Sequence, residues 1–514
     1  MRTKHTLFNF LITIASSLII PMLGFVKVRF FVELYGSNLN GMQLVFMQVI
    51  TYLNIFELSF SLAFRQLLFK HLAPLNKQEV LKIYYGARKI FKATGTIIIG
   101  LAFVFSFIIP LFIDVQGGVS YLESAFYFFV LAIPFGISYF MMGPNLVIIA
   151  DQKEYKISIW IQSIAVLRMF VMLGFIYLKL PVIYVFVLEG INVVGANFVA
   201  RHIALKHYPW LKDEYHGDND TQFKENAKYT VIQRLATVAT TSTDSLIIGT
   251  FLGTVATSIY GSYAYLTDTV TRIVNSAITA PINSFGNLFN DKKRDGYSVF
   301  TEYFNLSNYL ATIISISIFI AMDQFVLIWM DDSIYSLPKE ASLLFAINIY
   351  YLTQRESIII TRDANGLFKY AKNNAYLLTA TKIILSIILV NFIGVVGVLL
   401  ATTLSYWLVD FFYNPRLVYT KLFNLNPLRY YKMITVRIVI ALVIGFSFYM
   451  GWTMFSSYLN SSVLNFIIGC LVLGLSVTIV ITIIYIILFE SFRKLIARFY
   501  NLIFKKGALN EDNS

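Results

Sequence analysis

The sequence predicts an all-α, polytopic membrane protein with about fourteen transmembrane helices. Of its 514 residues, 57% are hydrophobic and only 13% are charged, whereas a soluble domain is about 45–50% apolar and about 25% charged. Continuous apolar runs recur along the chain, and each is long enough to cross a hydrocarbon core of ~30 Å as a helix. Alternating ten-residue patterns are absent, which favours helices over a membrane β-barrel. This composition excludes a soluble multidomain enzyme, a disordered chain and a disulfide scaffold.

The predicted spans are the apolar runs between clusters of charged and turn-forming residues. Polar residues interrupt the second and eighth spans, and only a short turn at 391–395 separates the eleventh from the twelfth. The first six spans are 8–30, 42–67, 92–113, 122–149, 157–178 and 181–201. The next six are 229–251, 258–285, 303–328, 340–361, 374–393 and 395–418, and two trailing spans follow at 431–454 and 463–488.

Basic residues set the predicted orientation. The chain has 41 Lys and Arg against 28 Asp and Glu, a formal charge of +13, and Arg2 and Lys4 place the N-terminus in the cytoplasm by the positive-inside rule. The even-numbered connections and the tail hold most other cations, so both termini are expected to be cytoplasmic. Cations are few on the opposite side: Lys27, Arg29, Lys179 and Lys339. This asymmetry explains a charge that in a soluble protein would indicate nucleic acid, and no nucleic-acid partner is expected.

No connection is long enough to fold as a domain of its own. The longest is polar and mixed in charge, and it falls between the sixth and seventh spans, where a two-lobed transporter would be divided. We therefore predict an N-terminal six-helix lobe at 1–203, a cytoplasmic linker at 204–226 and a C-terminal six-helix lobe at 227–425. Two additional transmembrane helices and a basic cytoplasmic tail make up 426–514.

Two short self-matches predict an internal repeat. Segment 30–41 resembles 247–258, with Gly36 aligned to Gly253, and segment 150–156 resembles 364–370. The two matches have nearly the same offset along the chain. Because six spans separate the copies, the two halves share one orientation in the membrane. Such a parallel repeat is typical of transporters that bind their substrate between two halves.

Ionisable residues inside the predicted spans are the candidates for function, because a charge at the bilayer centre costs about 2.5–3.5 kcal/mol. Arg65 and Arg234 lie near cytoplasmic span ends, where a long side chain reaches water and a purely structural role is equally plausible. Snorkelling explains the deeper charges less well. The full set is Glu57, Arg65, Arg168, Glu189, Arg234, Asp244, Asp268, Arg272, Lys382 and Asp410.

The seventh and eighth spans carry the most informative polar residues. The stretch 237–245 is polar around most of a helix, and its acid, Asp244, is a natural place to bind a proton or Na⁺. The alternative is a structural carboxylate that accepts hydrogen bonds from neighbouring threonines. Asp268 and Arg272 are four residues apart and share a helix face. They form either a neutralised packing pair or a site at which Arg272 offers its planar fork to a phosphate.

The sequence offers little for other chemistries. Cys470 is the only cysteine, and the five histidines have no metal-binding spacing, so disulfides and multi-cysteine metal sites are excluded. A P-loop, an ordered Ser-His-Asp set and a large external loop are all absent. No catalytic residue, no metal site and no cofactor beyond a coupling ion are therefore expected, and an enzyme is disfavoured.

Several segments resemble the bacterial polysaccharide (Wzx-type) flippases of the multidrug/oligosaccharidyl-lipid/polysaccharide exporter superfamily. The likeness covers about residues 5–425, with twelve spans in two parallel halves and two trailing spans. The segments that carry it are RFFVELYGSNLNG (29–41), YLNIFELSFSLAF (52–64), TDSLIIGTFLG (243–253), PINSFGNLF (281–289) and RDANGLFKYAKNN (362–374).

The resemblance implies a MATE-like transporter that flips an undecaprenyl-pyrophosphate-linked oligosaccharide repeat unit from the cytoplasmic to the outer leaflet of the bacterial plasma membrane. It implies alternating access coupled to H⁺ or Na⁺, a role in capsule or exopolysaccharide synthesis, and a polysaccharide polymerase with its chain-length machinery as partners. The alternatives are a lipid II flippase, a drug exporter of the same superfamily or, from another class, a membrane-embedded polysaccharide polymerase. The expected substrate-binding residues are Arg65, Arg168, Arg234, Arg272 and Lys382, and the expected ion-coupling residues are Glu57, Asp244 and Asp268.

Overall fold

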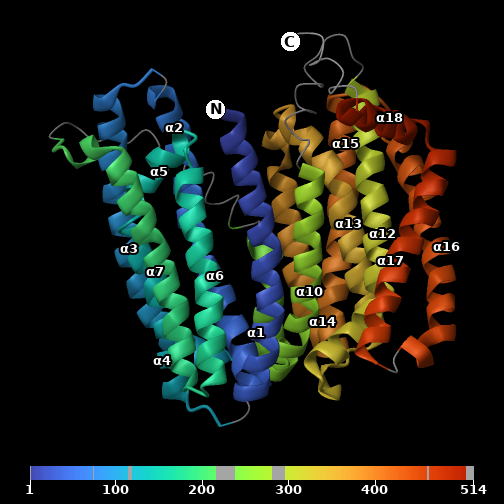
Figure 1. Ribbon diagram of the computed structural model, residues 1–514, viewed down its shortest axis with the longest axis horizontal. Helices are drawn as coiled ribbons and strands as arrows, with labels where there is room; N and C mark the ends of the chain where they lie inside the picture. The colour runs from blue at the N-terminus through green and yellow to red at the C-terminus, as the bar shows by residue number, and fades with distance from the viewer. Residues whose placement is uncertain are drawn as a thin grey trace. The chain divides into compact units, whose positions relative to one another are not determined.

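The computed structural model describes residues 2–72, 74–113, 118–215, 235, 238–279, 296–459 and 462–504. Within these ranges the regular elements are helices (Figure 1). The all-α prediction is therefore confirmed. The chain divides into two compact units, unit 1 from Met1 to Gly261 and unit 2 from Ser262 to Ser514. The predicted linker at 204–226 lies partly outside the described residues, so the predicted domain boundaries stay a prediction.

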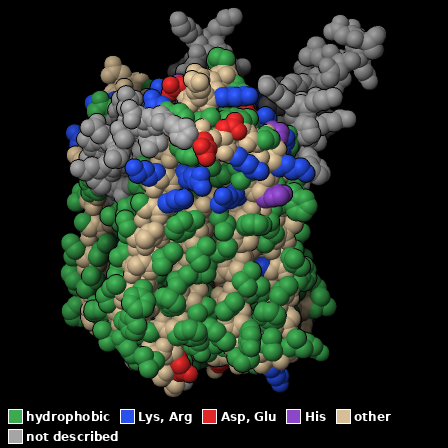
Figure 2. Space-filling view, turned by 90° about the vertical axis from the view of Figure 1, so that its left-hand side faces the viewer, with side chains coloured by type: hydrophobic (Ala, Val, Ile, Leu, Met, Phe, Trp, Pro, Cys, Tyr) green, Lys and Arg blue, Asp and Glu red, His purple; other side chains and the backbone are tan. Residues whose placement is uncertain are grey.

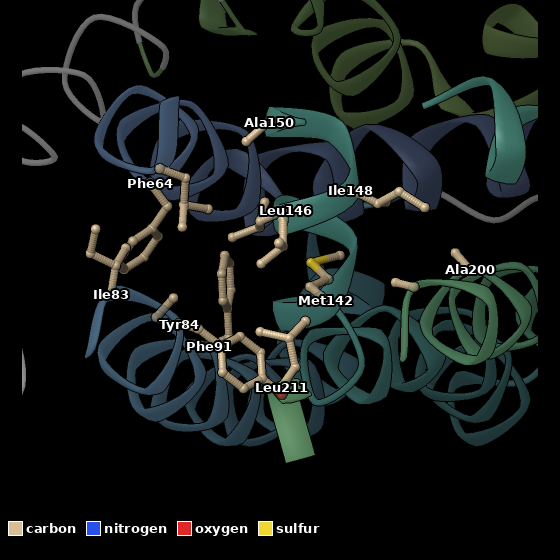
Figure 3. Packing of buried hydrophobic residues seen from close by; sticks show 14 of the residues in the cluster. Phe64, Ile83, Tyr84, Phe91, Met142, Leu146, Ile148, Ala150, Ala200 and Leu211 are labelled. Atoms are coloured by element: carbon tan, nitrogen blue, oxygen red, sulfur yellow. The ribbon is translucent and has the colours of Figure 1, made fainter. Parts of the chain in front are cut away.

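Unit 1 is a bundle of long helices around two apolar clusters. One cluster joins the ends of α2, α3, α5 and α7 through side chains such as Phe64, Phe91 and Leu146, which face one another in Figure 3. The second joins α1 to α4, α6 and α7. Its elements are α1 (Arg2–Leu53), α2 (Ile55–Leu72), α3 (Lys77–Phe112), α4 (Tyr121–Tyr139), α5 (Gly143–Ala150), α6 (Tyr155–Tyr177), α7 (Val182–His207), η1 (Pro209–Lys212), α9 (Asp244–Phe251) and the start of α10 (Gly253–Thr279).

Unit 2 is built around α12, which packs against α13, α16, α17 and α18. The helix α18 was not predicted; its buried Phe492 and Leu495 join an apolar cluster with α12 and α17, and it lies across their ends (Figure 1). Besides the rest of α10, the elements are α12 (Gly296–Met330), η2 (Ser333–Tyr335), α13 (Lys339–Ala364), η3 (Leu367–Ala371), α14 (Lys372–Ser405), the π turn η4 (Tyr406–Asp410), α15 (Phe411–Lys421), α16 (Leu428–Leu459), α17 (Val463–Leu488) and α18 (Glu490–Phe504).

The helices are suited to a membrane. Among the described residues, nine segments are long and apolar enough to cross one. Two of them, Ile19–Ser61 and Asn373–Lys421, contain a break and correspond to two predicted spans each. The helices α10 and α13 are long enough but more polar, and most of the predicted span 229–251 lies outside the described residues. The chain is a multi-pass membrane protein, and fourteen is an approximate count.

The lateral surface is also suited to contact with lipid. Figure 2 shows a face that is largely hydrophobic along its sides, with Lys and Arg gathered towards one end. Large apolar side chains such as Phe103 and Trp160 are more than half exposed. Exposing such groups to water costs about 25 cal/mol per Å², whereas lipid accepts them without this penalty.

Helix breaks in the two halves repeat at the positions that the self-matches align. Gly36 and Gly253, aligned by the first match, both have positive φ, 86° and 85°. Gln152 and Gly366, aligned by the second match, also both have positive φ, 57° and 72°, just after a helix end. The backbone thus turns in the same way at the aligned positions, which supports the repeat.

Candidate functional site

Unit 1 contains a group of three charges well inside its helices. Arg168 of α6 donates to the Glu189 carboxylate of α7 from Nη1, and both side chains are largely buried. Lys27 of α1 lies close enough to interact electrostatically with both. Its Nζ donates to Gln43 Oε1 at 3.2 Å and lies 4.9 Å from the centre of the Phe31 ring.

The position of Lys27 differs from the sequence interpretation, which counted it among the few cations on the external side, near the end of the predicted span 8–30. The first helix does not end near residue 30 but continues to the break at Gly36. Lys27 therefore lies within a membrane-crossing helix rather than at its end. Two cations and one carboxylate leave this group with a net positive charge, and the buried Arg168 Nε has no hydrogen-bond partner among the described residues. Such a group favours an anionic ligand.

Asp244 begins α9 in unit 1 and is buried. Its Oδ2 accepts a hydrogen bond from the Tyr260 hydroxyl at 3.1 Å. The preceding Thr243 shares a hydrogen bond of 2.7 Å with Tyr52 of α1. A carboxylate in the first turn of a helix also interacts favourably with the helix dipole. The acid is thus held by α10 and by the start of its own helix.

Two other predicted residues lie on α2. The backbone N–H of Glu57, which follows the break between α1 and α2, donates to Tyr139 Oη at 2.9 Å. Arg65 donates from Nε to the carbonyl of Ser61, one turn earlier, at 3.2 Å. Neither hydrogen bond joins α2 to the Lys27 group. Arg234 lies outside the described residues.

The predicted residues of unit 2 lie on α10 and α14. Asp268 and Arg272 are both exposed, and Arg272 Nε donates to the Asp268 carbonyl at 3.3 Å, so they are neighbours on one helix. Lys382 is buried in α14. When the second self-match is extended along the chain, Lys382 aligns with Arg168. On that alignment the two cations occupy corresponding positions of the two halves.

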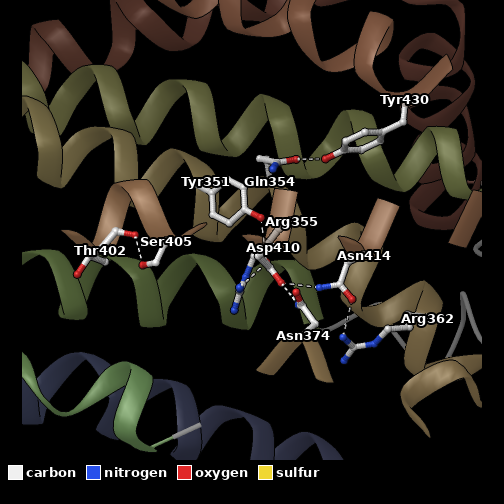
Figure 4. Close-up of polar contacts among 10 residues, drawn as sticks. All are labelled: Tyr351, Gln354, Arg355, Arg362, Asn374, Thr402, Ser405, Asp410, Asn414 and Tyr430. Atoms are coloured by element: carbon white, nitrogen blue, oxygen red, sulfur yellow. Dashed lines mark hydrogen bonds and ion pairs between the residues drawn. The ribbon is translucent and has the colours of Figure 1, made fainter. Parts of the chain in front are cut away.

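Asp410, at the end of the π turn η4, accepts hydrogen bonds at both of its carboxylate oxygens. Its Oδ2 accepts from Tyr351 Oη at 2.9 Å and from Arg355 Nη1 at 2.8 Å. Its Oδ1 accepts from the side-chain amides of Asn374 at 2.7 Å and Asn414 at 2.5 Å. Figure 4 shows these groups converging on the carboxylate from α13, α14 and α15. We call these five residues the Asp410 hub.

The hub leaves polar atoms without partners. The guanidinium carbon of Arg355 lies 5.2 Å from the centre of the Tyr406 ring and its side chain is 24% exposed. Its buried Nε has no hydrogen-bond partner among the described residues, and neither has Asn374 Oδ1. Arginine binds planar anions bidentately through N–H groups that have no other partner, so Arg355 is a functional candidate.

The sequence identifies Asp410 as an intramembrane acid, but it does not identify the residues that bind it. The predicted set of intramembrane charges does not include Arg355, and Tyr351, Arg355 and Asn374 lie far from Asp410 along the chain. The available signal was the helical spacing of Tyr351 and Arg355, which puts their side chains on one face of α13.

A further buried cluster joins the trailing helices α16 and α18 to α12 within unit 2. Arg437 of α16 lies 4.8 Å from the centre of the Phe304 ring and donates to Asn305 Oδ1. Glu302 of α12 is buried and pairs with Arg498 of α18 at 2.8 Å. These contacts hold α16 and α18 against α12. Groups of three His, Cys, Asp or Glu that could hold a metal ion are not found among the described residues.

Comparisons with known proteins identify the architecture. No family model matches the chain, and no curated protein is significantly similar. Among solved structures, "Lipid II flippase MurJ, inward closed conformation" matches with a TM-score of 0.66 and 14% identity, over 94% of this chain and 100% of that one. An inward-facing multidrug resistance MATE family transporter of the MOP superfamily matches with a TM-score of 0.56 and 10% identity, over 77% of this chain and 96% of that one.

The chain has the fold of these transporters. This confirms the predicted MATE-like architecture. Because the match to MurJ covers 94% of this chain, it must extend into the helices α16 and α17. At these identities the likeness concerns the fold alone, and the substrate has to be argued from the residues.

Proposed function

We propose that the protein is a flippase that moves an undecaprenyl-pyrophosphate-linked oligosaccharide repeat unit from the cytoplasmic to the outer leaflet of the bacterial plasma membrane. Its termini are cytoplasmic, and its product feeds capsule or exopolysaccharide synthesis by a polymerase with its chain-length machinery. The observation that carries the proposal is the net positive group of Lys27, Arg168 and Glu189 inside apolar helices. Intramembrane charges are expensive and mark substrate or ion pathways.

These residues can supply what such a substrate needs to cross the membrane. A pyrophosphate and its sugars lose their water when they enter hydrocarbon, which is very unfavourable without protein partners. Lys27 and the unbonded Nε of Arg168 can donate to phosphate oxygens, while Glu189 keeps Arg168 oriented. Arg65, Arg234, Arg272 and Lys382 provide further cations for the headgroup as it moves.

The acidic residues inside the helices are the proposed sites that couple transport to an ion gradient. Asp244 is buried, bonded to a tyrosine hydroxyl and placed at a helix start. Binding of H⁺ or Na⁺ there changes the charge of a helix terminus that packs against α1. Asp268 and Glu57 are the other proposed coupling residues, and no cofactor is needed.

Lipid II transport is the second candidate, because the match to MurJ covers nearly the whole chain. Both candidates move a polyprenyl-pyrophosphate-linked sugar, and they differ in the sugar portion. A drug exporter is less well supported, since the MATE transporter matches a smaller share of this chain.

Deletion of the gene, followed by analysis of lipid-linked intermediates, tests the proposal. We expect repeat units to accumulate in the cytoplasmic leaflet, with rescue by the wild-type chain. Rescue should fail with Arg168→Ala and also with the double variant Arg168→Ala/Glu189→Ala, in which no unpaired acid remains. Rescue by the double variant alone would assign Arg168 a structural role. Accumulation of lipid II instead would favour the second candidate, and normal intermediates would contradict both.

A further inference from the structure

A cationic cluster lies at one end of unit 1, apart from the charges discussed above. Lys156 of α6 has its Nζ 3.2 Å from Nδ1 and 3.3 Å from Nε2 of His207, the last residue of α7. Lys153, in the turn before α6, is close enough to interact electrostatically with the same imidazole. Figure 2 shows Lys, Arg and His gathered at this end of the hydrophobic surface.

The acid that contacts this cluster, Asp151, already has bonding partners. Asp151 pairs with Lys153 at 2.6 Å and also accepts a hydrogen bond from the Tyr208 hydroxyl. Burial, together with the bond to Asp151, raises the pKa of Tyr208 and keeps this hydroxyl a donor. Lys156 has no carboxylate partner within the described part of the chain. Its ammonium group therefore contacts an imidazole and is not in a salt bridge in this part of the chain.

An apolar stripe starts one turn away from Lys156 on the same helix. Trp160, Leu167 and Phe170 follow it after about one, three and four helical turns, so they share its face of α6. They are 56%, 61% and 58% exposed. Tryptophan is enriched at membrane interfaces. At a rise of about 1.5 Å per residue the stripe reaches about 21 Å from Lys156, which is close to half of a bilayer of about 40–45 Å including headgroups.

We propose that this end of α6 binds an anionic phospholipid, with its phosphate on Lys156 and His207 and its acyl chains along Trp160, Leu167 and Phe170. Charge complementarity selects the ligand, since basic pockets at helix ends attract anionic headgroups. On the proposed orientation the lipid belongs to the cytoplasmic leaflet. The site is distinct from the proposed substrate site, so it can be tested independently.

The test measures binding of phosphatidylglycerol and phosphatidylcholine to the full-length protein in detergent by native mass spectrometry. We expect the wild-type chain to bind phosphatidylglycerol more tightly. Lys156→Gln should weaken that binding about fivefold, the effect of one basic residue near an anionic surface, without changing phosphatidylcholine binding. His207→Gln should weaken it as well.

The matched control is Lys179→Gln, which removes an exposed cation just after the other end of the same helix. It should leave phosphatidylglycerol binding unchanged. Size-exclusion profiles establish that each variant is folded. Equal binding of the two lipids by the wild-type chain would overturn the proposal, and so would equal losses in Lys156→Gln and Lys179→Gln. Competition by inorganic phosphate alone, with no preference for the lipid, would also contradict it.

Discussion

Asp410 shows how a single carboxylate is kept inside this membrane protein. Four donors from three helices satisfy its two oxygens. Taking a carboxylate and a guanidinium out of water costs several kcal/mol each, and their pairing repays this only with good geometry and additional hydrogen bonds. The Asp410 hub meets both conditions, so removing one partner should be worse than removing both.

This difference can be measured in unfolding experiments. Arg355→Met leaves the buried Asp410 without its counter-charge and should lower the free energy of unfolding by about 3–5 kcal/mol. The double variant Arg355→Met/Asp410→Leu should lose clearly less. Thermal unfolding in detergent, followed by reaction of a fluorescent dye with the Cys470 thiol as it becomes exposed, provides the comparison. A loss in the double variant as large as that of Arg355→Met, or larger, would contradict this account of the pair.

At the scale of elements, the helix breaks organise each unit. Gly36 separates the two parts of α1, and the second part then packs closely on the start of α10. A Cβ on Gly41 would lie 1.7 Å from the Thr254 carbonyl oxygen. Nearby, Asn40 Nδ2 donates to Ser258 Oγ at 2.7 Å. This approach between backbones requires glycine at position 41.

Gly41→Ala should therefore destabilise unit 1 by about 1–3 kcal/mol, the usual cost of overpacking. Gly100→Ala is the matched control, because position 100 is also helical and has no neighbour within 4 Å of an added Cβ. Its effect should be neutral or stabilising by up to about 1 kcal/mol, from helix propensity. The measurement is the melting temperature of each variant in detergent. If the two variants melt alike, the packing of α1 on α10 is not as close as described.

The elements also show where sequence reasoning succeeds. Continuous apolar runs were enough to locate most helices, and the self-match that aligned Gly36 with Gly253 found two equivalent breaks. Sequence reasoning failed for α18, which is amphipathic and too polar to be predicted as a span, and for the continuation of α1 beyond residue 30 to the break at Gly36. Helix ends depend on local backbone conformation at a glycine, which hydropathy does not register.

For the whole molecule, the sequence predicted the architecture far better than the contacts of the charged residues. The bilayer imposes helix length and hydrophobicity, and these are local properties of the chain. The pairing of Arg168 with Glu189 and the grouping of Arg355, Asn374 and Asn414 around Asp410 join different helices. Such partners are set by tertiary packing, so composition and spacing named the charges without naming their neighbours.

The most direct test of the proposed function is transport by the purified protein. Proteoliposomes that contain it, with an undecaprenyl-pyrophosphate-linked oligosaccharide in one leaflet, should expose the sugar on the other side faster than protein-free vesicles. Lys27→Gln should slow this exposure at least tenfold, and Lys179→Gln should leave it unchanged. No acceleration by the wild-type protein, with or without a H⁺ or Na⁺ gradient, would contradict the account.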